Sequence, residues 1–205
     1  MAHRPLDRTV VGILEAMGRR MWGFPPQIMA LVVAEMGATG AALWFARNMP
    51  RFLHTRRVLG PLRTHLACIA VSLHNSCTYC AYGHAYALEL LYLRDRGRLF
   101  PLDAATLASW LDLEPRELAD RLHKLLEDAG MHAEVLWVDR TIGLATGTYT
   151  PVDRDEARLR HLVGMVGTMN RVAVDRAAEP DEAHDPVNKD AAVKARHAEM
   201  RSVAP

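Results

Sequence analysis

The sequence has few cysteines, few aromatic residues and almost no excess charge. Its 205 residues include three cysteines, and 6% are aromatic. Three cysteines are too few, and too close together, to staple a secreted disulfide scaffold. With 25 Lys and Arg against 24 Asp and Glu, the formal charge is +1, which excludes the broad basic field typical of nucleic-acid-binding proteins. No apolar leader follows the first residues, so we expect a cytoplasmic protein.

Apolar residues make up half of the chain and recur at steps of three and four along most of it, which predicts an all-α fold. Residues 28–46 form the longest apolar run and are numerous enough to cross a bilayer. Glu35 lies near the middle of this run, where a membrane would make an unpaired carboxylate costly. We therefore expect a buried helix that ends before Pro50 and no membrane association.

Two segments depart from this helical pattern. Residues 131–149 are rich in Val, Thr and aromatic side chains with two glycines, and they favour either a small β-hairpin or an irregular loop. From Ala178 onward the chain lacks Leu, Ile and aromatic residues and has three prolines. Such a segment buries little apolar surface, so we predict a helical domain over residues 1–177 and a flexible charged tail over 178–205.

Residues 107–126 read as two helices joined by a short turn that ends at a proline, as in a helix-turn-helix, and the segment after Gly130 would then be a wing. Residues 103–128 carry seven acidic and three basic side chains, a net charge of −4. This charge repels phosphates. DNA binding is therefore the less favoured function, and we expect no nucleic-acid partner.

Cys77, Cys80 and His84 form the most informative pattern, CxxC followed by a histidine four residues later. On a helix that begins near Asn75 or Ser76, the three side chains share one face. Cys77 then lies in the first turn, where the helix dipole favours a thiolate. His84 can accept the proton of Cys80 or pair with its thiolate. Such a dithiol can cycle through a disulfide.

Two other interpretations of this pattern stay open. The two cysteines and the histidine could hold zinc with His65 or Cys68 as a further ligand, although the sequence has no second CxxC or HxxxH pair. The cysteines could also be ordinary core residues, because free cysteine is often buried. Attachment of haem c is excluded, since it requires CxxCH and alanine follows Cys80.

The segment AVSLHNSCTYCAYGH, residues 70–84, resembles the core of the carboxymuconolactone decarboxylase superfamily, in its alkylhydroperoxidase D-like (AhpD-like) branch. The small AVS turn, both cysteines and the histidine fall on the family pattern in register. The likeness covers roughly residues 58–95. A weaker likeness covers GTMNRVAV, residues 167–174, which is similar to an asparagine-rich closing helix of the family.

The chain departs from the family pattern at two positions. The family places its proton-relay glutamate where this chain has His65, and it often has histidine between the cysteines where this chain has Tyr79. His65 could still act as a base near neutral pH or fix the tautomer of His84, or it could serve only in helix packing.

The resemblance implies an all-α, AhpD-like protein that assembles as a trimer or hexamer and reduces organic hydroperoxides as an antioxidant thiol peroxidase. Cys80, polarised by His84, would attack the peroxide and become a sulfenic acid. Cys77 would then condense with it to a disulfide, and His65 is the candidate relay residue. No metal or bound cofactor is implied, because an external dithiol, on a lipoyl, thioredoxin-like or peroxiredoxin partner, would restore both thiols. A decarboxylase-like member or a non-catalytic redox sensor is the alternative within the superfamily.

Overall fold

The structure is a computed structural model that describes residues 5–203, and most of these residues are helical. In chain order the elements are α1 (Pro5–Trp22), α2 (Ile28–Leu59), α3 (Pro61–His74), α4 (Thr78–Arg96), α5 (Ala104–Ala108), α6 (Pro115–Asp128), η1 (His132–Glu134), α7 (Val135–Thr146), α8 (Arg154–Asp175), η2 (Pro186–Lys189) and α9 (Ala191–Ser202). The two η elements are short 3₁₀ turns. No strand occurs in this part of the chain, so the all-α prediction is confirmed.

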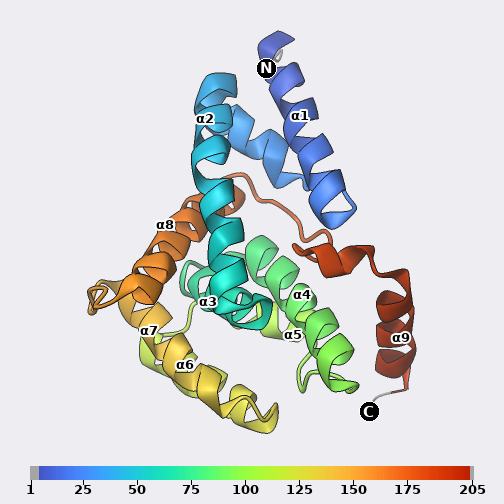
Figure 1. The fold of residues 1–205 in the computed structure, drawn as a ribbon, viewed down its shortest axis with the longest axis vertical. Helices are drawn as coiled ribbons and strands as arrows, with labels where there is room; N and C mark the ends of the chain where they lie inside the picture. The colour runs from blue at the N-terminus through green and yellow to red at the C-terminus, as the bar shows by residue number, and fades with distance from the viewer. Residues whose placement is uncertain (1–4, 204–205) are drawn as a thin grey trace.

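Helices α3 and α4 pack against each other at the centre of the molecule (Figure 1). On one side, α5, α6 and α7 cover them with an apolar core that includes Ile69, Leu73 and Leu88. On the other side, α1, α2 and α8 form a second core, to which Cys77 and Cys80 belong. The junction between α3 and α4 therefore lies where the two cores meet.

Helix α2 is longer than predicted and is bent. Gly37, at φ 71° and ψ 164°, interrupts the helical geometry, a conformation that glycine adopts without a Cβ penalty. The helix does not end before Pro50 but continues to Leu59. Met49 and Phe52, on either side of the proline, are buried, and their packing holds the chain helical across it. By length and composition alone α2 could cross a membrane, as some core helices of soluble proteins also could. Its most apolar stretch is 39% buried, which is less than expected for the buried helix predicted from the sequence.

The prediction of a hairpin or loop at residues 131–149 is wrong, because η1 and α7 occupy most of this segment. Val138, Thr141 and Ile142 are buried at helical spacing. Packing against α3 and α6 therefore overrides the β preference of these branched side chains. The wing of the supposed helix-turn-helix is absent for the same reason.

The tail predicted to be flexible is folded over residues 178–203, the part of it that the structure describes. After α8 the chain crosses to α4, and α9 runs beside that helix (Figure 1). Ala183 and Val187 are buried against α4. The buried carboxylate of Glu89 binds His197 at 2.8 Å and Arg201, which fixes α9. A prediction based on apolar content alone does not detect polar contacts of this kind. We refer to residues 178–190 below as the returning segment.

Candidate functional site

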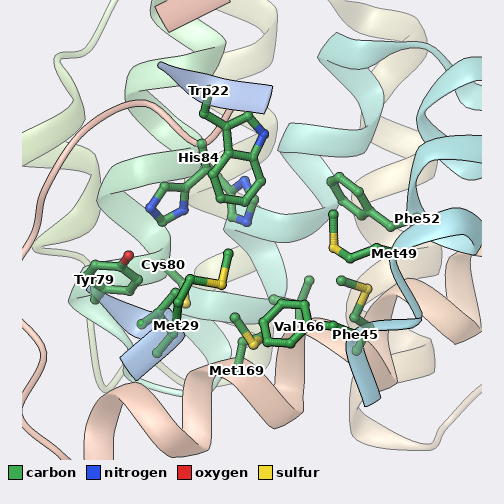
Figure 2. A pocket seen from close by; sticks show the side chains of 13 residues that line it. Trp22, Met29, Phe45, Met49, Phe52, Tyr79, Cys80, His84, Val166 and Met169 are labelled. Carbon is green, nitrogen blue, oxygen red and sulfur yellow. The ribbon is translucent and has the colours of Figure 1, made fainter. Parts of the chain in front are cut away.

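A small cavity lies between α1, α2, α4, α8 and the returning segment (Figure 2). Its volume is about 50 Å³. Apolar side chains form most of the wall, among them Met29, Phe45, Met49, Phe52 and Met169. The polar part of the wall consists of Tyr79, Cys80, His84 and His184. Methionine side chains are flexible, so this wall can adjust to an apolar guest larger than the cavity itself.

Both cysteines of the CxxC motif lie at the start of α4. Cys77 is the residue that precedes the first helical residue, rather than Asn75 or Ser76 as predicted, and it is in an extended conformation. Cys77 and Cys80 are free thiols and are 1% and 3% exposed. Cys80 lines the cavity, and Cys77 is not among the lining residues. Cys80 is thus the thiol that a molecule in the cavity meets.

The pKa values of the two thiols are shifted in opposite directions. A hydrogen bond from the Cys80 thiol lowers the pKa of Cys77, and the backbone N–H groups of Cys80 and Tyr79 lower it further, against the effect of burial. The hydrogen bond to Cys77, together with burial and the charge of that thiolate, raises the pKa of Cys80 well above its usual value. Of the two sulfurs, Cys77 is therefore the one whose thiolate is favoured, and Cys80 is the one that keeps its proton.

His65 and His84 are hydrogen-bonded through their Nδ1 atoms at 3.0 Å. The other nitrogen of His65, Nε2, lies 3.0 Å from Oδ2 of Asp185. All three groups are buried, with exposed fractions of 0%, 8% and 1% for His65, His84 and Asp185. They form a continuous chain from α3 through α4 to the returning segment.

Burial opposes the ionisation of Asp185, but hydrogen bonds from His65 and from the Val187 N–H, with the charge of Arg56, outweigh it and hold the pKa of Asp185 below its usual range. Arg56 lies 2.7 Å from the same oxygen that binds His65. A carboxylate only accepts, so Nε2 of His65 carries a proton and its Nδ1 is an acceptor. Nδ1 of His84 must then be the donor, which leaves Nε2 of His84 with a free lone pair.

His84 is therefore held as a neutral base at the cavity wall. Burial lowers the pKa of His84 well below its usual value, and the neighbouring rings of His65 and His184 lower it further. A neutral imidazole with a free Nε2 can accept a proton from a group in the cavity, and the chain to Asp185 stabilises the charge that forms.

A second histidine, His184, comes from the returning segment. Its Nε2 lies 3.0 Å from Oδ1 of Asp181, whose other oxygen accepts a hydrogen bond from the Tyr79 hydroxyl at 2.8 Å. The ring of His184 packs so close to Gly83 that a Cβ there would overlap it. The His184 N–H donates to the Gly83 carbonyl at 3.0 Å. Gly83 thus permits the returning segment to dock on α4.

The four predicted site residues, Cys77, Cys80, His84 and His65, lie close together, but only two of them line the cavity. Cys80 and His84 both line the cavity, Cys77 is hydrogen-bonded to Cys80 but does not line it, and His65 contacts His84 from behind. Cys68 is fully buried, and burial raises the pKa of its thiol, which makes it a core residue. Among residues 5–203, no group of three His, Cys, Asp or Glu side chains is placed to hold a metal ion, so the four-ligand arrangement considered with His65 or Cys68 is not assembled.

Sequence reasoning missed Asp181, His184 and Asp185. All three lie in the segment predicted to be flexible. A local signal was present, since aspartate followed by proline is typical of a helix start, and Asp185 does cap η2 through the Val187 N–H. This signal predicts local order but not the contact with His65.

The two segments that carry the resemblance lie against each other. Asn170 on α8 donates from Nδ2 to the Val71 carbonyl at 3.3 Å, and its Oδ1 accepts from Ser72 at 3.2 Å. Comparison of the chain with models of known families, with curated proteins and with solved structures finds no match.

Proposed function

We propose that this protein is a thiol peroxidase of the AhpD-like type, which reduces organic hydroperoxides through the Cys77–Cys80 dithiol. The observation that carries the proposal is the buried chain Asp185–His65–His84, which ends at a cavity wall shared with Cys80. A carboxylate that orients an imidazole, which in turn polarises a group at a reactive centre, is a recurrent arrangement for proton transfer.

The hydrogen-bonded series Asp185–His65–His84 supports the proposal at the position where this sequence departs from the family pattern. The resemblance leads one to expect a glutamate where His65 stands, and His65 alone has no charge to stabilise a protonated His84. Asp185 supplies that negative charge from a distant part of the sequence, 120 residues from His65. His65 then acts as a relay between the carboxylate and the base.

The first step of the proposed reaction reduces the peroxide. Cys80 gives its proton to Nε2 of His84 while its sulfur attacks the terminal oxygen of the hydroperoxide. The O–O bond breaks, the alkoxide takes the proton from His84 and leaves as an alcohol, and Cys80 becomes a sulfenic acid. The sulfur is oxidised and the peroxide oxygens are reduced.

The second step closes the disulfide. The Cys77 thiolate attacks the Cys80 sulfur, the S–O bond breaks, and hydroxide leaves and takes a proton from solvent to become water. The lowered pKa of Cys77 suits this role, because it favours the thiolate, which is the attacking form. An external dithiol, on a lipoyl, thioredoxin-like or peroxiredoxin partner, reduces the disulfide and returns both thiols. A cytoplasmic location fits such a reductant.

The apolar cavity wall supports an organic rather than an inorganic peroxide. Its methionine and phenylalanine side chains would cover an alkyl or aryl group while the peroxide end faces Cys80 and His84.

Large apolar side chains on α1 and α2, among them Leu6, Ile13 and Leu53, are exposed, and they support assembly as a homo-oligomer, a trimer or hexamer in our proposal.

Steady-state consumption of an organic hydroperoxide in the presence of a dithiol tests the function. Wild type should turn over, and Cys80→Ser should not. Cys68→Ser is the matched control, since that thiol is buried in the core and should leave turnover unchanged apart from a small effect on stability. A wild type that is oxidised once but does not turn over with any dithiol would support the redox-sensor alternative instead.

A further inference from the structure

The face between α2 and α8 has an excess of positive charge that the proposed reaction does not use. Two adjoining hollows of about 430 Å³ and 490 Å³ lie on this face, within the size range of small-molecule sites. They share Arg51 and His161. The first also includes Arg154 and Arg158, and the second includes Arg47 and Arg160.

Arginines from both helices line the two hollows. Arg47 and Arg51 are one helical turn apart on α2, and Arg154 and Arg158 are one turn apart on α8, which packs beside α2 (Figure 1). Neither hollow is lined by an Asp or Glu side chain among the described residues. Asp155 pairs with Arg158 at 2.8 Å.

The other arginines of the groove have no acidic partner. Within residues 5–203 no carboxylate forms an ion pair with Arg47, Arg51 or Arg154, and Arg160 donates only to the Leu144 carbonyl, at 2.7 Å. This uncompensated charge occurs in a chain whose net charge is +1. Burial, together with the charges of Arg51 and Arg47, lowers the pKa of His161. The groove is therefore an electropositive site that a multiply charged anion would neutralise.

An aromatic side chain lies at one end of the groove. Trp44 lines the second hollow beside Arg47 and is partly buried. Its ring packs edge-on against Phe45, with centroids 5.0 Å apart, and this contact fixes its position. Gly164 forms part of the opposite wall, and a Cβ built there meets nothing within 4 Å. The hollow thus has an indole on one side and open space over α8 on the other.

We propose that the α2–α8 groove binds a nucleoside diphosphate or a ligand of the same chemistry, with two linked phosphates held by the arginines and a planar ring against Trp44. Arginine guanidinium groups bind phosphate oxygens through paired hydrogen bonds, and arginines from both helices line the two adjoining hollows, which suits a ligand with at least two phosphates. The arginines and Trp44 do not line the dithiol cavity, which shares only Met165 with the groove, so the proposal does not depend on the peroxidase function.

Calorimetric titration of the full chain with ADP tests the proposal. ADP should bind with a dissociation constant of about 0.1 mM or tighter at moderate salt. Arg51→Ala should weaken binding by about tenfold or more, because Arg51 borders both hollows. Arg171→Ala is the matched control, since Arg171 is exposed on the same helix as Arg154 and Arg158 but lines neither hollow, and it should change the affinity less than about twofold.

Two further ligands, pyrophosphate and adenosine, measure separately what the phosphates and the ring contribute to binding. Pyrophosphate should bind about tenfold more weakly than ADP, and adenosine should not bind measurably. Trp44→Leu should weaken the binding of ADP but not of pyrophosphate. Gly164→Leu should weaken the binding of ADP by filling the hollow, since a Cβ at this position meets nothing within 4 Å. Circular dichroism melts of each variant show whether the fold is kept.

Several outcomes would overturn the proposal. ADP that binds equally well to wild type and Arg51→Ala does not occupy the groove. If pyrophosphate binds as tightly as ADP, the planar ring contributes nothing to the affinity, and its proposed contact with Trp44 is wrong. Duplex DNA that binds in an Arg51-dependent manner, while ADP does not, would make the face a nucleic-acid surface. Absence of ADP binding at millimolar concentration would reject the site altogether.

Discussion

Asp185 Oδ2 lies 3.0 Å from Nε2 of His65, although the two residues are 120 positions apart in the chain. The same oxygen lies 2.7 Å from Arg56, so one buried carboxylate joins α2, α3 and the returning segment. This contact fixes the tautomer of His65 and, through it, that of His84.

Asp185→Asn should lower kcat/KM for an organic hydroperoxide by about 10- to 100-fold. The amide can still accept a hydrogen bond from His65, but it carries no charge to stabilise a protonated imidazole. Asp139→Asn is the matched control, because Asp139 also binds a histidine, His123, at 2.7 Å, but on the surface of α6 and α7. Equal effects of the two variants on the measured rate would contradict a relay role for Asp185.

His65→Gln and Asp185→Asn should not be additive. Asp185 acts through His65, so once His65 is replaced, the second substitution should lower kcat/KM by no more than about twofold. A double variant whose loss equals the product of the two single losses would show that Asp185 acts independently. Thermal melts of all three variants separate this effect from loss of the fold.

The buried neutral His84 should make stability fall at acidic pH. Its pKa in the folded protein is well below the ordinary value of 6.5 that holds in the unfolded chain, so the unfolded state binds more protons as the pH falls below 6.5. The contribution of His84 is therefore fully present above pH 6.5 and decreases as the pH falls from there towards the lowered folded value.

Urea unfolding midpoints between pH 8 and pH 5 measure this loss. His84→Gln should remove part of the decrease that wild type shows below pH 6.5. The depressed pKa values of Asp181 and Asp185 act in a separate window, since those carboxylates lose their contribution only as the pH falls below their usual value of 3.8. A variant that follows the wild-type curve down to pH 5 would show that His84 is not held neutral by burial.

Gly83→Ala should destabilise the protein by about 1–3 kcal/mol, because the new methyl group overlaps the His184 ring and displaces the returning segment. Gly164→Ala is the matched control on another helix, since its Cβ meets nothing within 4 Å, and it should stabilise by up to about 1 kcal/mol. Thermal or urea unfolding measures both changes. A destabilisation of Gly164→Ala as large as that of Gly83→Ala would contradict the packing explanation.

The local part of the site could be predicted from the sequence, and the distant part could not. The spacing of Cys77, Cys80 and His84 placed them on one face at the start of a helix, and α4 begins within three residues of the predicted start. Asp185 follows no periodic pattern and is fixed by tertiary contacts with His65 and Arg56. Such contacts leave no trace in helical periodicity.

Two of the departures from the predicted fold, at α7 and at the returning segment, have a common cause. Val138 and Ile142 favour strands when they are considered singly, but their spacing of four residues fits the buried face of α7. The returning segment has little apolar surface, yet Ala183 and Val187 are buried and Glu89 anchors α9 through ion pairs. Neither the strand preference of single residues nor the apolar content of a segment takes into account the elements against which that segment packs.

A single-turnover reaction tests the central claim most directly. Fully reduced protein, without any other dithiol, is mixed with one equivalent of an organic hydroperoxide, and the alcohol formed and the disulfide formed are measured together. The account predicts one alcohol per molecule and a disulfide between Cys77 and Cys80, while Cys77→Ser stops at a sulfenic acid that can be trapped on Cys80. Alcohol formation that persists in Cys80→Ser, or a sulfenic acid found on Cys77 instead, would contradict it.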